Sequence, residues 1–178
     1  TTNFAHGLPI FCSSLALEID GVAQVAAVYD PTRRELFTAE RGGGAFLNGR
    51  PLRVSAAESL IEAVLVTGFP YDVHARVQEI VGLFAEFVGR ARAVRRLGSA
   101  AIDLCYVAAG RMDGFWERDL NAWDIAGGAL LVQEAGGTIT RFDGQPYFSR
   151  GRDVVASNGR IHGAMLDVIA GPRDALSR

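Results

Sequence analysis

The stretch LNAWDIAGGALLVQEAGG, residues 120–137, decides the fold because it predicts one apolar helix closed by a glycine pair. A single carboxylate, Asp124, stands beside Trp123 at the start of this helix. A carboxylate here can complement the helix dipole, which is worth roughly 0.3–1 kcal/mol. It can also serve as an oxygen ligand for a hard cation. Both interpretations stay open at this point, because the helix pattern is the same for each.

Strands and helices alternate around this helix throughout the second half of the chain. Apolar residues recur at helical spacing from Val77 to Val88, which predicts an amphipathic helix. A second helix is expected over residues 100–109, closed by Gly110, and a last one from residue 160. Short apolar runs predict the strands between them, at residues 94–97, 113–117, 137–142 and 154–157.

The first part of the chain has a different period. Short alternating runs from residue 14 to residue 54 are punctuated by turn signals, which are Asp20-Gly21, Asp30-Pro31 and Asn48-Gly49. This pattern predicts an antiparallel meander, followed by a further strand at residues 63–67. The Gly42-Gly43-Gly44 run lies between two of these strands, so we interpret it as a turn and not as a nucleotide loop.

Composition indicates one globular domain. The 178 residues, 49% of them hydrophobic, suffice for a buried core without disulfides. No apolar run reaches the roughly 20 residues that span a bilayer, and no signal-peptide pattern opens the chain. We therefore expect a cytoplasmic protein with no membrane partner. Cys12 and Cys105 lie in apolar segments without CxxC spacing, which predicts two reduced, buried thiols.

Charged residues exclude several functions. A net charge of -2 gives no basic footprint, so no nucleic-acid partner is expected. All 18 basic residues are arginine, which excludes a Schiff-base lysine and a Walker-type phosphate loop. We interpret the arginines at residues 90–96 as the solvated end of a helix. The histidines lack metal-ligand spacing, and surface or capping roles are expected for His6, His74 and His162.

Two places along the chain carry candidate chemistry. Gly98 allows close backbone approach after a strand, and Ser99 is a good N-cap for the next helix, so the first amides of that helix face whatever lies above. Glu117 ends a strand directly before the helix of Asp124, and open α/β sheets bind ligands at such strand ends. Each feature alone fits an ordinary helix start or surface charge; together they favour a binding site.

These stretches, in this order, resemble the inositol monophosphatase family of magnesium-dependent, lithium-sensitive sugar phosphatases. The similarity covers essentially the whole chain, and its most specific part is the long WD to EAGG pattern. It is carried by WDIAGGALLVQEAGG (123–137), DGFWE (113–117), GSAA (98–101), TGFP (67–70) and the hairpin FTAERGGGAFLNG (37–49).

The resemblance implies an α+β fold, a layered αβαβα sandwich of the inositol monophosphatase and fructose-1,6-bisphosphatase type with its N-terminal part missing. We expect residues 1–178 to form a single phosphatase domain, incomplete at the N-terminus, with residues 1–76 mostly antiparallel sheet and residues 77–178 alternating α/β. The opening TTNFAHGLP resembles the sequence that follows the family's metal-binding DPxDG motif. The chain is therefore expected to begin directly after that motif.

The resemblance also implies a site. Asp124 is expected to be catalytic, to ligate magnesium and to lie beside a substrate hydroxyl. Thr1 is expected to be catalytic by positioning the attacking water, and the amides of Thr1 and Thr2 to contact the phosphate. Contacts to the sugar or polyol are expected from the remaining matched positions, which are Gly98, Ser99, Ala100 and Glu117.

The implied activity is Mg2+-dependent phosphomonoester hydrolysis by a metal-activated water, most closely that of an inositol-1-monophosphatase. Dications neutralise a phosphate dianion and acidify a bound water, which explains the carboxylate ligands. Two or three Mg2+ per active site are expected in the complete protein. The expected partners are a small-molecule phosphate monoester and a second copy of the chain in a homodimer.

Two alternatives stay open. One is a related sugar phosphate or histidinol phosphate phosphatase. The other is a catalytically inactive fragment that acts as a binding or dimerisation module, because Asp124 is the only one of the family's carboxylate magnesium ligands that this sequence matches. The 178-residue chain alone is accordingly expected to be inactive.

The sequence departs from the usual family pattern at three places. Ser99 stands where the family commonly has threonine, a mild change that keeps the hydroxyl cap. Arg118-Asp119 adds a charge pair after Glu117, at the expected rim of the pocket. Gly127-Gly128 costs up to about 1 kcal/mol per glycine in helix propensity unless another element packs closely against them.

Overall fold

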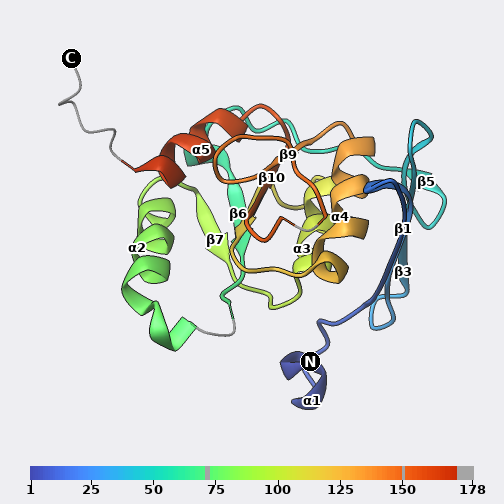
Figure 1. The fold of residues 1–178 in the computed structure, drawn as a ribbon, viewed down its shortest axis with the longest axis horizontal. Helices are drawn as coiled ribbons and strands as arrows, with labels where there is room; N and C mark the ends of the chain where they lie inside the picture. The colour runs from blue at the N-terminus through green and yellow to red at the C-terminus, as the bar shows by residue number, and fades with distance from the viewer. Residues whose placement is uncertain (71–72, 150, 172–178) are drawn as a thin grey trace.

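The computed structural model describes residues 1–70, 73–149 and 151–171, and it has the α+β architecture expected from the sequence. Figure 1 shows the elements in layers, with α2 and α5 on the left, a mixed sheet next, two helices in the middle and an antiparallel sheet on the right. The helices are α1 (Thr2–Ala5), α2 (Val77–Val88), α3 (Ala100–Ala108), α4 (Ala122–Glu134) and α5 (His162–Ala170), with short 3-10 turns at Leu60–Glu62 and Val73–Ala75.

The antiparallel sheet is the predicted meander. Its strands pair in chain order, β1 (Ser13–Ile19), β2 (Val22–Asp30), β3 (Glu35–Glu40), β4 (Gly44–Leu47) and β5 (Arg50–Pro51). Asp20 and Gly21 have φ of 52° and 76°, and Asn48 and Gly49 have φ of 48° and 78°. Two successive left-handed residues match the twist of a two-residue hairpin, so both turn predictions are confirmed.

The second sheet is mixed, in the order β7 (Ala93–Arg95), β6 (Val64–Thr67), β8 (Gly114–Glu117), β10 (Val154–Ser157) and β9 (Thr138–Thr140). β6 runs parallel to both β7 and β8, whereas β10 is antiparallel to β8 and β9. Because β6 and β8 are parallel neighbours, their carboxyl ends meet at one edge. Gly68 and Glu117 are therefore brought together there.

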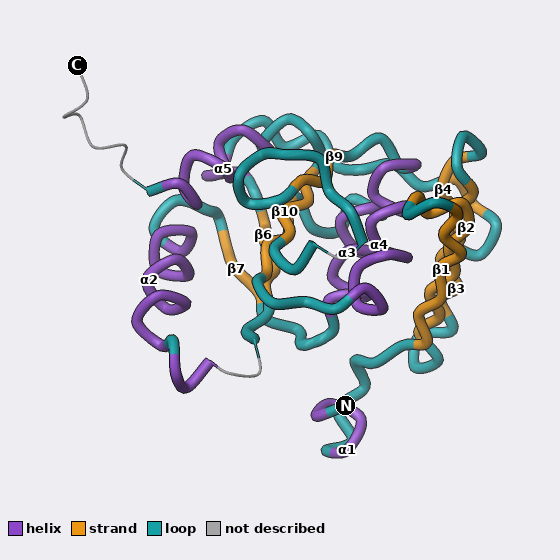
Figure 2. Tube along the Cα trace, in the orientation of Figure 1, coloured by secondary structure: helices purple, strands orange, loops and turns teal. Residues whose placement is uncertain are grey.

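Helices α3 and α4 lie between the two sheets (Figure 2). The glycine pair of α4 explains how they fit. A Cβ added to Gly127 would lie 3.2 Å from the Leu15 carbonyl oxygen of β1, and one added to Gly128 would lie 2.5 Å from Leu104 Cβ of α3. The close packing that would justify two helix glycines is thus present on both sides of α4.

The outer face of the antiparallel sheet carries apolar side chains. Leu15 is 70% exposed, and Leu17, Val25, Tyr29 and Leu36 are also largely exposed. Across the parts of the chain that the structure describes, no further layer covers this face (Figure 1). An αβαβα sandwich has an additional helical layer, and this face is the position where such a layer would pack.

The environment of one histidine differs from the sequence-based expectation. His162 is not on the surface: it is 7% exposed, and its ring nitrogens lie 2.9 Å from Thr140 Oγ1 and 3.0 Å from Ser157 Oγ. The surface or capping interpretation is wrong for this residue, because the start of α5 packs against β9 and β10.

None of the described helices has the length and apolar character needed to cross a bilayer.

Candidate functional site

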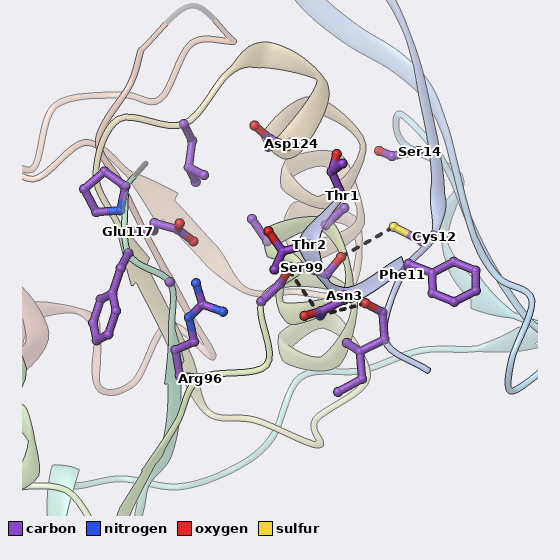
Figure 3. A pocket seen from close by; sticks show the side chains of 18 of the residues that line it. Thr1, Thr2, Asn3, Phe11, Cys12, Ser14, Arg96, Ser99, Glu117 and Asp124 are labelled. Atoms are coloured by element: carbon purple, nitrogen blue, oxygen red, sulfur yellow. Dashed lines mark hydrogen bonds between the residues drawn. The ribbon is translucent and has the colours of Figure 1, made fainter. Parts of the chain in front are cut away.

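A cavity of about 490 Å³ lies at the edge where β6 and β8 end and where α3 and α4 begin. Figure 3 shows labelled side chains from separate segments around it, among them Thr1, Ser99, Glu117 and Asp124. All the site residues expected from the resemblance line this cavity, namely Thr1, Thr2, Gly98, Ser99, Ala100, Glu117 and Asp124. The fold therefore brings them together, and their individual roles stay predictions.

The position of Asp124 is compatible with both roles that its sequence position left open. Its Oδ2 accepts a hydrogen bond from the Asn121 backbone N–H at 3.1 Å, which is one half of a capping box at the start of α4. No donor among the described residues contacts Oδ1, and the side chain lines the cavity. One oxygen caps the helix while the other remains available to a ligand.

Glu117 is a buried carboxyl group and not a surface residue. It is 7% exposed, and its carboxylate lies so close to Gly68 that any Cβ at position 68 would overlap both carboxylate oxygens. A larger residue at position 68 would therefore displace the Glu117 carboxyl group from this position. Burial raises the pKa of Glu117 to about 8, the Arg96 guanidinium opposes this rise, and the Asp124 carboxylate adds to it.

The pH dependence of stability gives a test of this environment. A carboxyl group whose pKa is raised from 4.5 to about 8 binds its proton more tightly in the folded state. Its contribution to stability is complete below the unfolded pKa and is lost as the pH rises towards 8. We expect Glu117→Gln to flatten the decline in the free energy of unfolding between pH 5 and pH 8, measured by urea denaturation. An unchanged slope would contradict a protonated Glu117.

The turn before α3 has the predicted conformation but not the predicted cap. Gly98 has φ of 89°, a left-handed value that favours glycine. Ser99 occupies the N-cap position, but its side chain makes no capping hydrogen bond, and its Oγ lies 3.7 Å from Cys12 Sγ instead. The serine hydroxyl faces the cavity, which suits a contact with a ligand better than a cap does (Figure 3).

Asn3 holds the opening residues against this turn. Its Nδ2 donates to the carbonyl oxygens of Ile10 and Leu97, each at 2.9 Å, and the side chain is nearly buried. Thr1 and Thr2 reach the cavity because Asn3 fixes the short helix α1 beside Gly98. The sequence analysis missed this residue, and no local signal marks it, since its partner at Leu97 is far away in the chain.

Cys12 and Arg96 also line the cavity, and both were interpreted differently from the sequence. Cys12 is only half-buried, whereas Cys105 is buried as expected, and both are free thiols. Arg96 does not end a helix: it follows β7 and lies over the Phe69 ring, 5.7 Å from its centroid. Only Arg90 of that cluster follows a helix, where it pairs with Glu86 of α2.

Asp103 is a further carboxyl group that the sequence analysis missed. It is fully buried in α3, and neither oxygen has a hydrogen-bond partner within the described ranges. Burial raises its pKa well above the usual range, and the neighbouring Glu117 carboxylate adds to that rise. Burial without a hydrogen-bond donor therefore favours the protonated form of Asp103 over the ionised form.

The number of ligand side chains at the cavity determines whether the described residues could bind a metal ion. Residues 1–70, 73–149 and 151–171 contain no group of three or more His, Cys, Asp or Glu side chains placed to bind one ion. Mg2+ requires near-octahedral oxygen coordination. Asp124 supplies one carboxylate oxygen to the cavity, so the described residues contribute to such a site but do not complete it.

The other carboxylates of the recognised motifs are structural. Glu134 of α4 accepts hydrogen bonds from the backbone N–H groups of Gly42 and Gly44, both at 3.0 Å. Asp113 accepts one from the Val64 N–H at 2.6 Å. These contacts tie the hairpin to α4 and β8 to β6, and they explain why carboxylates stand at both positions.

The fold and the site define a class: layered α+β proteins with a cavity at the ends of two parallel strands. The inositol monophosphatase family profile matches residues 1–174. The chain therefore belongs to the inositol monophosphatase family, as the sequence motifs indicated, and its fold is the one expected from them.

Individual relatives agree with this assignment. The chain is 48% identical to an inositol-1-monophosphatase of Mesorhizobium japonicum, over 98% of this chain and 66% of the relative. It is also 48% identical to a protein named Nus factor SuhB of Pseudomonas aeruginosa, over 95% and 63%. The solved inositol monophosphatase of Anabaena (Nostoc) superposes with a TM-score of 0.92 at 42% identity, over 96% of this chain and 68% of that one. The chain thus spans just under two thirds of the length of these curated relatives.

Proposed function

We propose that the complete protein hydrolyses a small-molecule phosphate monoester in a Mg2+-dependent reaction, with inositol 1-phosphate as the first candidate substrate. The observation that carries this proposal is the convergence of Thr1, the Gly98 turn, Glu117 and Asp124 on one cavity in a chain of this family. Mg2+ would supply the charge that neutralises the phosphate and acidifies a bound water.

The chain's own residues then have distinct proposed roles. The unpaired Oδ1 of Asp124 is a metal ligand and lies beside a substrate hydroxyl. Thr1 positions the attacking water, and the amides of Thr1 and Thr2 contact the phosphate. Ser99, with the backbone at Gly98 and Ala100, contacts the hydroxyl groups of the leaving alcohol. Glu117 binds a hydroxyl as well, and in its protonated form it can donate as well as accept.

Other properties of the complete protein are part of the same proposal. We propose that it acts in the cytoplasm as a homodimer and that its partner is a small molecule. A relative named inositol-1-monophosphatase and one named Nus factor SuhB are equally similar to this chain. Similarity to named relatives therefore does not decide which of the two names describes the function of this protein. The net charge of -2 and a cavity lined by the matched residues favour the small-molecule reaction.

Phosphate release by the full-length protein tests this function. The substrates are inositol 1-phosphate, histidinol phosphate, fructose 1,6-bisphosphate and a nucleotide 3'-phosphate, each with Mg2+ and with EDTA. We expect release that requires Mg2+ and is fastest with one sugar or polyol phosphate. No release from any of the esters would contradict the proposal.

The binding-module alternative is tested separately on the 178-residue chain. We expect this chain to release no phosphate, because one carboxylate does not hold two dications against hydration. Calorimetric titration with Mg2+ measures whether any metal is retained. Binding that disappears in Asp124→Asn would support the proposed ligand, whereas rapid turnover by this chain alone would contradict the expectation of an incomplete site.

A further inference from the structure

We propose that Asp119 is a positioning residue that sets the arrangement of Glu117 and Asp124 by holding the loop between them, residues 118–121. This inference rests on the proposed function, because it assigns those two carboxylates to the leaving-group side of the substrate. The loop joins the end of β8 to the start of α4, and Asp119 itself lines the cavity. Its conformation therefore fixes how far apart the two functional side chains lie.

The backbone at Asp119 is in a conformation that needs support. Its φ is 60°, in the left-handed region that side chains other than glycine rarely adopt, although aspartate and asparagine tolerate it better than most. A residue in this region persists where the surrounding structure holds it. At Asp119 that support comes from charged contacts.

Two arginines from separate segments pair with the Asp119 carboxylate. Arg76, directly before α2, bonds one oxygen through its Nη1. Arg152, shortly before β10, approaches the other with Nη2 at 3.2 Å. The Asp119 side chain is only 22% exposed, so these pairs lie closer to the protein interior than the exposed pairs on α2. The loop is thus held from two sides of the cavity rim.

Residues on either side of Asp119 also attach the loop to the segment directly before β10. The Asp119 N–H donates to Asp153 Oδ1 at 3.3 Å, and Arg118 Nη1 lies 3.2 Å from Asp153 Oδ2. The Leu120 N–H donates to the Arg152 carbonyl oxygen at 2.9 Å. Since Glu117 pairs with Val154 in the β8–β10 ladder, these contacts continue the pairing of the two segments beyond the strands.

We call this set the rim cluster. Among the described residues its three cations and three anions alternate in space, with Arg118 Nε 3.5 Å from Glu79 Oε1 and Arg76 Nε 3.1 Å from Glu79 Oε2. These alternating charges attract one another across separate segments, so the cluster acts as a clamp on the loop. Its members are Arg76, Glu79, Arg118, Asp119, Arg152 and Asp153.

The clamp predicts a dependence on salt. Arg152 is 67% exposed, so dissolved ions screen its pairing with Asp119. Ion pairs at this level of exposure contribute little to global stability. The effect of breaking them should therefore be found in the order of the loop and in the affinity for substrate, and much less in the melting temperature.

The test uses Asp119→Asn in the full-length protein. Asparagine keeps the size of the side chain and tolerates the left-handed backbone, but it removes the charge. We expect amide hydrogen exchange in a peptide covering residues 118–126 to become several-fold faster. We also expect KM for the best ester to rise about threefold, with kcat within about twofold. Added NaCl should raise KM of the wild type and change that of the variant much less.

Controls separate the clamp from general damage. Glu86→Gln removes an exposed pair with Arg90 on α2 and should change neither exchange nor KM. Arg152→Gln removes one of the two ion pairs of Asp119, so it should act in the same direction as Asp119→Asn but more weakly. The double variant should be no worse than Asp119→Asn alone, because the Arg152 pair is already weakened in that variant. Unchanged exchange in Asp119→Asn, or faster exchange with unchanged KM, overturns the proposal. If the wild type releases no phosphate, the proposed function fails, while the exchange data still decide whether the clamp exists.

Discussion

Asp124→Asn in the full-length protein should lower kcat/KM for phosphate esters about 10³-fold, because a metal's stabilisation of transition-state charge is worth several kcal/mol. The substitution is well matched to the structure. The asparagine side-chain oxygen can still accept the Asn121 N–H, so the helix cap is retained while the anionic ligand is lost. The melting temperature should therefore change little. Steady-state kinetics and thermal unfolding of the same preparation measure the two effects.

Glu134→Gln is the matched control for this prediction. Glu134 belongs to the same helix, but its carboxylate accepts hydrogen bonds from Gly42 and Gly44 of the hairpin and lies outside the cavity. We expect lower stability, by about 1 kcal/mol, and kcat/KM within about twofold of the wild type. If Asp124→Asn keeps kcat/KM within about tenfold, Asp124 is only a helix cap and the proposed metal site is wrong.

Local physical rules explain why so much of the fold could be predicted. The helix over Val77–Val88 follows from apolar spacing alone, and the structure places it at those residues. The Asp20-Gly21 hairpin follows from the backbone freedom of the two turn residues. Glu117 and the Gly98 turn line one cavity because both lie where strands end, and their contact with a ligand stays a prediction.

The missed residues depend on contacts between distant parts of the chain. Asn3 acts on Leu97, and Arg96 lies over Phe69, so no window of sequence contains either pair. Asp103 has the pattern of an exposed residue early in a helix, but α3 is buried between two layers. Such burial is a property of the assembled layers and cannot be read from helix periodicity.

The ion pairs of Arg118 and Asp119 are a further case of contacts that sequence patterns do not reveal. The sequence placed both charges at the expected rim of the pocket, and Asp119 does line the cavity. Their partners come from distant segments, Asp153 for Arg118, and Arg76 and Arg152 for Asp119, so these contacts depend on tertiary structure.

Gly128→Ala is the substitution for which packing and intrinsic propensity predict opposite signs. Alanine improves helix propensity by up to about 1 kcal/mol. Its Cβ, however, would lie 2.5 Å from Leu104 Cβ, and neither atom can rotate away because both are fixed to the backbone. Helices α3 and α4 must then separate, and overpacking of this kind costs about 1–3 kcal/mol. We expect a net loss of about 2 kcal/mol in the free energy of unfolding, measured by urea denaturation.

Gly82→Ala provides the control, because Gly82 lies in α2 with no atom within 4 Å of the added Cβ. Only the propensity effect operates there, so this variant should be more stable than the wild type by up to about 1 kcal/mol. The opposite signs of the two glycine substitutions are the decisive result. If Gly128→Ala also stabilises the protein, α3 and α4 do not pack as closely as the structure has them, and the position of Ser99 relative to Asp124 changes with them.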